Sequence, residues 1–125
     1  MTAGTHTLSG ALNLLAANTQ NVTLAGATNN PTVNVTGDID FTGAGAGTEV
    51  ITSGTATWTG SANVNFTSGT YTATSGNTLV MSGTGTLTSA ANTLQNVTLS
   101  GSITLANATH TVAGNLSFAG GAITA

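Results

Sequence analysis

Apolar and polar residues alternate along this chain in short runs, and a glycine stands before many of the runs. The recurring unit is glycine, any residue, apolar, any residue, apolar, and it occurs at 10–14, 37–41, 101–105 and 114–118, with a longer variant at 60–66. Residues two apart in a β-strand point to the same side, so each unit has one apolar and one polar face. Glycine before the strand allows a tight turn. The pattern predicts many short, glycine-punctuated β-strands.

Further strands are expected at 55–59, 70–74, 78–81 and 86–88, which are bounded by glycine or Ser-Gly. Residues 11–17 are the best helix candidate, but the segment is short and its leucines fit the strand unit better. A loop is predicted at Asn29, Asn30 and Pro31, because proline has no N–H for a ladder of hydrogen bonds. A second break is expected at 44–47, which contains only Gly and Ala.

The chain is also a degenerate array of repeats. Residues 6–14 are similar to 110–118, and residues 20–24 are similar to 95–99, but the two offsets differ. The strand-like segments lie closer together than the roughly 8–12 residues typical of a β-sandwich. We therefore predict an all-β fold, a parallel β-helix-like solenoid with about three strands per coil, and keep a β-sandwich as the alternative. Residues 1–125 are interpreted as one repeat domain whose ends look like cuts through a longer array.

Charge is almost absent, and this narrows the functional classes. The chain has no Lys or Arg, three acidic residues and no Cys. Nucleic-acid binding is excluded because phosphates are neutralised by Lys and Arg, and no apolar run reaches the ~18 residues of a membrane helix. Cationic side chains commonly guard strand edges against pairing with other molecules. Their absence indicates that pairing between molecules is tolerated or intended.

Several runs resemble a known kind of sequence: TWTG at 57–60, NVNFTSGTYTA at 63–73, TLVMSGTG at 78–85 and NTLQNVTL at 92–99. They are similar to the tandem β-strand repeats of very large bacterial surface proteins, in the style of filamentous-haemagglutinin and autotransporter passenger regions. This resemblance implies a secreted, elongated, non-enzymatic protein of the cell surface, used in adhesion, surface layers or matrix. It supplies no catalytic residue, and the chain is much shorter than such arrays usually are.

Candidate chemistry is sparse. His6 and His110 both lie within Thr-His-Thr and are interpreted as equivalent strand positions, and no nucleophile-elbow sequence accompanies them. Asp38 and Asp40 share one strand face and would bind Ca²⁺ if turn carbonyls completed six to eight oxygen ligands. The aspartate-bearing nonapeptide of calcium-binding β-rolls is absent, so a solvated pair is the favoured interpretation. We expect no enzyme activity, no metal and no cofactor.

The leading functional hypothesis is an extracellular subunit that self-assembles head to tail into a β-rich filament or surface layer. Uncapped solenoid ends expose unpaired backbone groups, and a contact that does not close on itself produces a filament. The expected assembly residues are Thr5, His6, Thr7 and Leu8 near one end and Thr109, His110, Thr111 and Val112 near the other.

Two alternative functions remain open at the sequence level. The first is the binding module of a giant surface adhesin, with surface glycans as partners. The second is an ice-binding protein, because Thr-x-Thr pairs such as Thr5/Thr7 and Thr84/Thr86 would form a regular array on a flat solenoid face. Thr is also simply a good strand former at exposed positions, which weakens the second alternative.

Overall fold

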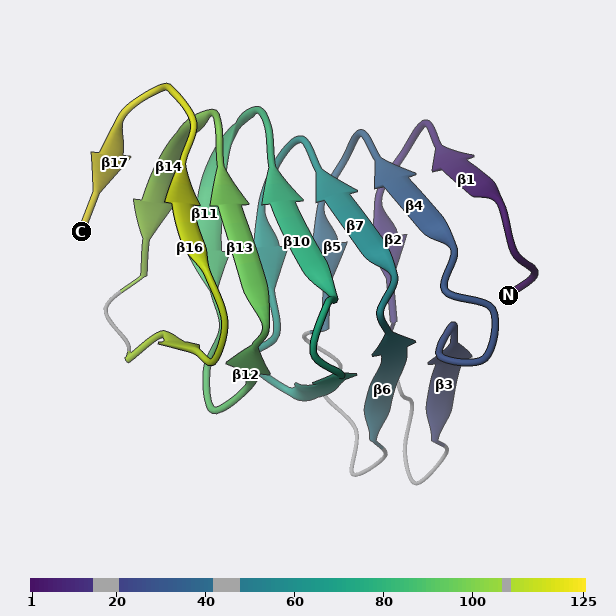
Figure 1. Ribbon diagram of the computed structural model, residues 1–125. Coiled ribbons are helices and arrows are strands. Elements are labelled where there is room, and N and C mark those ends of the chain that lie inside the picture. Colours follow the sequence, from purple (N-terminus) through teal and green to yellow (C-terminus); the bar gives the residue numbers. More distant parts are fainter. Residues whose placement is uncertain (15–20, 42–47, 107–108) are drawn as a thin grey trace.

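The computed structural model describes residues 1–14, 21–41, 48–106 and 109–125, and all regular structure in these ranges is β-strand. The strands pair in parallel throughout. The chain winds as a solenoid whose coils stack along one axis, with the N-terminus at one end and the C-terminus at the other (Figure 1). This confirms the predicted parallel β-solenoid, since a sandwich pairs its strands antiparallel.

The first sheet contributes one strand to each coil and runs the whole length of the axis. Its six strands, in spatial order, are β1 (Thr5–Leu8), β4 (Thr32–Val35), β7 (Thr57–Gly60), β10 (Thr78–Met81), β13 (Asn96–Leu99) and β16 (Leu116–Phe118). Spatial order follows chain order, so β1 and β16 are its edge strands.

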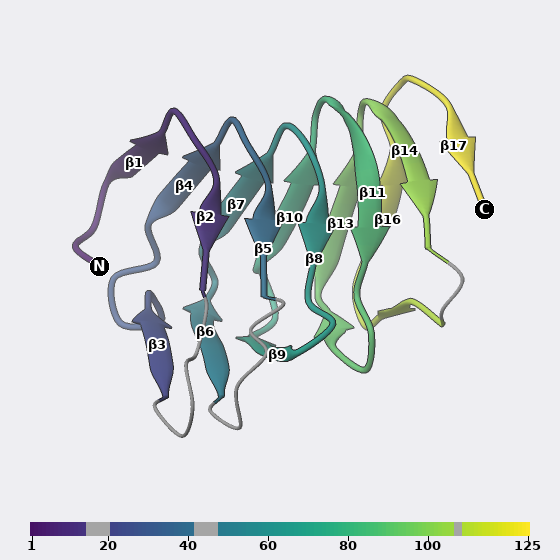
Figure 2. The same ribbon diagram turned by 180° about the vertical axis from the view of Figure 1, so that it is seen from behind.

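The second sheet lies on the opposite side of the solenoid, as the view from behind shows (Figure 2). Its strands are β2 (Leu12–Asn13), β5 (Ile39–Asp40), β8 (Val64–Asn65), β11 (Thr84–Thr88), β14 (Ser102–Leu105) and β17 (Ile123–Thr124). Most of the glycine-led units map here, because 10–14, 37–41, 60–66 and 101–105 contain β2, β5, β8 and β14. The unit at 114–118 instead contains β16 of the first sheet.

The third face closes each coil and changes along the axis. It consists of a three-stranded sheet and a two-stranded sheet, formed by β3 (Val22–Ala25), β6 (Glu49–Gly54) and β9 (Gly69–Ala73), and by β12 (Thr93–Leu94) and β15 (Thr111–Val112). The two sheets are linked where the Tyr71 backbone N–H donates to Asn92 Oδ1 at 2.7 Å. The third face therefore extends along the whole solenoid, but its strands do not form one continuous hydrogen-bonded sheet.

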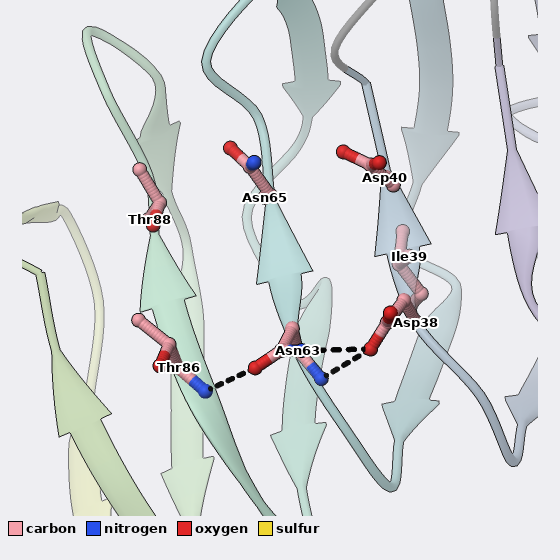
Figure 3. Close-up of a pocket in the computed structure, with 7 residues that line it drawn as sticks. All are labelled: Asp38, Ile39, Asp40, Asn63, Asn65, Thr86 and Thr88. Carbon is pink, nitrogen blue, oxygen red and sulfur yellow. Dashed lines mark hydrogen bonds between the residues drawn. The ribbon is translucent and has the colours of Figure 1, made fainter.

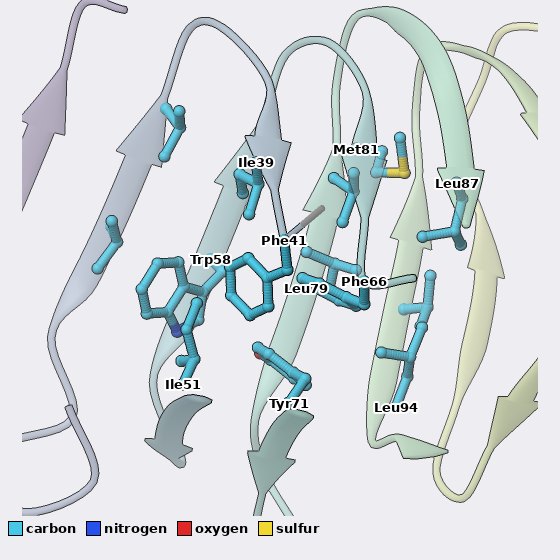
Figure 4. Close-up of a cluster of buried hydrophobic side chains, with 14 of the residues drawn as sticks. Ile39, Phe41, Ile51, Trp58, Phe66, Tyr71, Leu79, Met81, Leu87 and Leu94 are labelled. Carbon is cyan, nitrogen blue, oxygen red and sulfur yellow. The ribbon is translucent and has the colours of Figure 1, made fainter. Parts of the chain in front are cut away.

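The core consists of columns of apolar side chains that point inward from the same register position in successive coils (Figure 4). In the first sheet, Val33, Trp58, Leu79 and Val97 form one column, and each is at most 1% exposed. Each such side chain contributes about 1.5–3 kcal/mol when fully buried. Aromatic rings thicken the middle coils: Phe66 lies 5.0 Å from the ring centroids of both Phe41 and Tyr71.

The coils near the N-terminal end are longer than those in the C-terminal half. Thr5 pairs with Thr32 in the first two coils, whereas Thr78 pairs with the much nearer Asn96 in later ones. Segments that are similar in sequence consequently do not occupy the same face of the solenoid in their respective coils. Residues 6–14 run from the first to the second sheet, but 110–118 run from the third face to the first sheet.

Most of the predicted local elements are present. The strands expected at 55–59, 70–74, 78–81 and 86–88 correspond to β7, β9, β10 and β11. The predicted loop at Asn29–Pro31 is confirmed, and Asn30 adopts a φ of 45° there. Within the helix candidate at 11–17, Leu12 and Asn13 form a strand, while 15–17 and the predicted break at 44–47 lie outside the described residues.

Candidate functional sites

The expected assembly residues lie at the two ends of the solenoid but on different faces. Thr5, His6, Thr7 and Leu8 constitute β1, the N-terminal edge strand of the first sheet. Thr111 and Val112 constitute β15, an edge strand of the third face, and Thr109 and His110 come directly before it. The strand that occupies the position of β1 at the C-terminal end is β16, which comes later in the chain.

The C-terminal edge strand exposes two large apolar side chains. Leu116 is 48% exposed and Phe118 is 59% exposed, although their partners one coil inward, Val97 and Leu99, are each 1% exposed. No other large hydrophobic side chain in the described ranges is classed as exposed. The inward-facing columns of the first sheet are therefore open at this end.

The N-terminal edge is better covered. His6 and Leu8 hold the first positions of the same two columns and are half-buried. The Met1 ammonium donates a hydrogen bond to the carbonyl oxygen of Ala25 at 2.5 Å, and Asn29 Nδ2 donates to the carbonyl oxygen of Met1 at 2.8 Å. The segment before β1 thus folds back along the end of the third face.

The two histidines are not equivalent, so that part of the sequence interpretation was wrong. His6 points inward from an edge strand, and its Nε2 lies 2.9 Å from the carbonyl oxygen of Thr2. His110 lies at a corner before β15, with Nδ1 2.8 Å from Ser89 Oγ and Nε2 3.2 Å from the carbonyl oxygen of Ala106. The different phase of the two repeats explains the difference.

The Ser89–His110 pair resembles part of a catalytic triad, but its surroundings do not. A triad needs a carboxylate on the far nitrogen of the imidazole and a nucleophile that substrate can reach. Here a backbone carbonyl accepts from Nε2, which leaves Nδ1 to accept from the Ser89 hydroxyl, and Ser89 is 0% exposed. The pair fastens one coil to the next.

The outward face of the first sheet is uncharged and rich in threonine. One column along the axis consists of Thr5, Thr32, Thr57, Thr78 and Asn96, and the parallel column consists of Thr7, Asn34, Thr59, Val80, Thr98 and Ser117. Successive strands are about 4.8 Å apart and alternate residues on a strand about 6.6 Å apart. The hydroxyl and methyl groups therefore form a two-dimensional array.

The outward face of the second sheet carries a hollow of about 330 Å³. Its lining comes from three successive coils and consists of Asp38, Ile39, Asp40, Asn63, Asn65, Thr86 and Thr88 (Figure 3). The polar residues form two rows across the strands, one from Asp38 through Asn63 to Thr86 and one from Asp40 through Asn65 to Thr88. All six polar side chains point away from the core.

Hydrogen bonds hold the first row of the hollow in place. Asp38 Oδ1 accepts from both the backbone N–H and Nδ2 of Asn63, each at 3.0 Å, and Asn63 Oδ1 accepts from the backbone N–H of Thr86 at 2.9 Å. In the second row, Asn65 Oδ1 accepts from the backbone N–H of Thr67 at 3.0 Å. The amide groups of both rows are therefore oriented before any ligand arrives.

The sequence identified Asp38 and Asp40 in this hollow but missed their amide and hydroxyl neighbours. The signal was present in the repeat unit. Superposing the unit at 37–41 on the variant at 60–66 by their apolar pairs places Asp38 over Asn63 and Asp40 over Asn65, which is the pairing observed. No group of three or more His, Cys, Asp or Glu residues suited to a metal occurs in the described ranges.

A buried polar cluster anchors the corner beneath the first sheet. Ser53 Oγ accepts from Trp58 Nε1 at 2.5 Å and from Asn77 Nδ2 at 2.7 Å, and the Tyr71 hydroxyl donates to Asn77 Oδ1 at 2.8 Å. Burial raises the pKa of Tyr71 to about 12, although its hydrogen bonds to Ser53 and Asn77 act in the opposite direction. The phenol consequently stays protonated and keeps donating.

Comparison of the chain with protein-family models, with curated proteins and with solved structures finds no match. The fold places it in the class of parallel β-solenoids. Among the described residues, no helix is long and apolar enough to cross a membrane.

Proposed function

We propose that this chain is a non-enzymatic structural subunit that assembles head to tail, outside the cell or on its surface, into a filament or layer. The observation that carries the proposal is the open C-terminal edge, where Leu116 and Phe118 expose about half of their side chains at inward-facing positions. An apolar edge strand without charged residues is a template for pairing with another chain. The absence of Lys and Arg also leaves trypsin-like proteases no site to cut.

The columns of the first sheet define the register of the junction. Continuing the ladder beyond β16 places β1 of the next copy beside it, with Leu116 opposite His6 and Phe118 opposite Leu8. On the second sheet the same register places Leu12, the first residue of β2 in the next copy, beside Ala125, which directly follows β17. The head-to-tail contact therefore uses Leu116–Phe118 as the partner of Thr5–Leu8, and the residues around β15 lie beside it on the third face.

The third face contributes less to this junction, because the ends differ there. Val22 pairs with Glu49 at the N-terminal end, whereas Thr93 pairs with Thr111, a partner much closer in the chain, at the C-terminal end. More residues therefore separate paired positions at the N-terminal end of this face than at its C-terminal end. We infer that the first and second sheets carry the contact, since both keep the same parallel register from end to end.

The assembly prediction concerns Phe118→Asp. Docking a second copy on this variant would bury a carboxylate among apolar side chains, so we expect polymers of the parent chain and only monomers of the variant. Sedimentation velocity and negative-stain electron microscopy measure the assembly state of the parent chain and of the variant. Thr98→Asp is the control, because it adds the same charge to the outward face one strand away and should still polymerise. Monodisperse monomers of the parent chain at high concentration, or polymers of Phe118→Asp, would contradict the proposal.

Ice binding is the second candidate function, and the threonine columns on the outward face of the first sheet favour it. This face combines a regular register with the absence of charge over six strands. A repeating hydroxyl and methyl array orders water more regularly than a mixed charged surface does. It would use a different surface from the assembly junction.

The corresponding prediction is that the parent chain shows thermal hysteresis in a nanolitre osmometer and that Thr59→Tyr removes most of it. The aromatic side chain would interrupt the centre of the face and hold an ice plane away from the neighbouring columns. Thr104→Tyr is the matched control, since Thr104 is an exposed residue of β14 on the second sheet. A parent chain without hysteresis eliminates this candidate.

A further inference from the structure

We propose that the hollow on the second sheet is a binding subsite for an uncharged oligosaccharide. Six polar side chains from three consecutive coils surround a volume of about 330 Å³, which lies at the lower end of the range of ligand pockets, roughly 300–1,000 Å³. The hollow faces outward on the second sheet, away from both ends. The inference is independent of the assembly proposal, because a single copy contains the whole hollow.

Charge selects the class of ligand. The chain contains no Lys or Arg, and two of its three carboxylates, Asp38 and Asp40, line this hollow. Phosphorylated, sulfated or uronic ligands would bring negative charge against these carboxylates without any cation to offset the repulsion. A neutral polyhydroxylated ligand meets no such penalty.

The hydrogen-bonding groups match sugar hydroxyls. Each sugar hydroxyl donates one hydrogen bond and accepts others, so it needs both kinds of partner within a short distance. The carboxylates accept, the amides of Asn63 and Asn65 donate and accept, and the hydroxyls of Thr86 and Thr88 do either. Ile39 lies between the two aspartates, but its side chain points into the core and is 1% exposed, so the apolar groups within reach of a ligand are the methyl groups of Thr86 and Thr88.

Preorganisation and repetition add to the match. The hydrogen bonds from Asn63 to Asp38 and from Thr86 to Asn63 hold one row before ligand binds, so less side-chain freedom is lost on binding. Within each row the polar groups follow one another at the spacing of the strands, about 4.8 Å, and the two rows lie about 6.6 Å apart. A row of polar groups at regular spacing suits a linear ligand that lies across the strands, parallel to the solenoid axis.

The affinity is expected to be low. Aromatic rings that stack on sugars are absent from the lining, and Trp58 and Tyr71 are both buried on the inside of the solenoid. We therefore expect a dissociation constant for a single chain on the order of 1 mM. Binding of this strength is measured directly by NMR titration.

The experiment uses the ¹⁵N-labelled Phe118→Asp variant, because its monomers give resolved amide signals and its substitution lies on β16, outside the hollow. The variant is titrated with four neutral hexasaccharides: cellohexaose, xylohexaose, mannohexaose and maltohexaose. We expect saturable amide shifts for at least one of them, confined to residues 38–40, 63–65 and 86–88. Asn65→Ala combined with Thr88→Ala should weaken that binding at least about tenfold, equivalent to ~1.4 kcal/mol. Asn34→Ala combined with Thr59→Ala, which removes an amide and a hydroxyl from the first sheet, should leave it unchanged.

Two results would overturn the inference. The first is the absence of saturable shifts with all four sugars, or shifts that persist unchanged in the double variant of the hollow. The second comes from a parallel titration with CaCl₂: saturable shifts at Asp38 and Asp40 with the metal alone, and none with any sugar, would identify a cation site in place of a saccharide subsite. Failure of polymerisation has no bearing on either result.

Discussion

Replacing Trp58 with alanine is expected to lower the free energy of unfolding by about 3–5 kcal/mol, the usual cost of removing a large aromatic side chain from a core. Trp58 is the largest fully buried side chain and is 1% exposed. It lies in the middle of the inward column between Val33 and Leu79, so coils on both sides lose contacts. Its Nε1 also donates to Ser53 Oγ, and that hydrogen bond disappears with the ring.

Urea denaturation followed by far-UV circular dichroism measures this effect. Thr59→Ala is the matched control: Thr59 is the next residue on β7 and points outward, so the change in stability should stay within about 0.5 kcal/mol. Unfolding of a stacked array need not be all-or-none, and the slope of the transition should be compared between the variants. If Trp58→Ala lowers the free energy of unfolding by less than about 1 kcal/mol, the packing of this column does not make the expected contribution to stability.

The alternation of apolar and polar residues predicted the strands, and their close spacing along the chain favoured the parallel solenoid over a β-sandwich. Units such as 37–41 have an apolar pair two residues apart, and Ile39 and Phe41 are indeed both buried. The strand predicted at 78–81 coincides with β10. These features are local, because they depend on side-chain spacing and on glycine at the turns.

The assignment of each strand to a face was not predictable in the same way. It depends on the length of each coil, and this length varies along the chain, as the pairs Thr5 with Thr32 and Thr78 with Asn96 show. A similarity such as 6–14 with 110–118 therefore relates strands on different faces. The position of Phe118 opposite Leu99, and so the open edge, follows only from the three-dimensional register.

The hollow on the second sheet also depends on the three-dimensional register, which the local sequence pattern does not give. Asp38 and Asp40 were evident as two carboxylates on one strand face, but the ligand class depends on what stands beside them in the next coils. Those neighbours are amides and hydroxyls at the same register, and one carboxylate oxygen of Asp38 already accepts two hydrogen bonds from Asn63. Residues of the neighbouring strands β8 and β11 surround the two aspartates with amides and hydroxyls. The subsite is therefore mixed and polar rather than purely acidic, and this could not be read from the strand of Asp38 and Asp40 alone.

The outward surfaces of the first and second sheets differ in chemistry, because each polar position repeats along the axis. The first sheet presents mainly threonine and no ionisable group, whereas the second presents both solvent-side aspartates. Both faces stay exposed to solvent in the assembly, since the proposed junction lies at the two ends of the solenoid. A filament of this kind would display its side faces in multiple copies, which raises the avidity of a weak subsite for a long polymer.

Glycine at the turn between the first and second sheets leads to the other large stability effect. Gly101 stands two residues after the end of β13, and Gly83 holds the same place after β10 in the preceding coil. A Cβ at Gly101 would overlap the carbonyl oxygen and carbonyl carbon of Gly83. Because the obstacle is backbone, no side chain can rotate away, and the two coils must separate at this turn.

We therefore expect Gly101→Ala to destabilise the chain by about 3 kcal/mol, at the upper end of the usual cost of overpacking. Gly10→Ala is the matched control, since Gly10 stands two residues after β1 at the same turn of the first coil and a Cβ there meets no atom within 4 Å. That change should be neutral or stabilising by up to about 1 kcal/mol, because alanine restricts the unfolded chain. Equal effects of the two substitutions would show that turn conformation, rather than close stacking of the coils, sets the requirement for glycine. Ala62 holds this place after β7, so glycine is not required at this position in every coil.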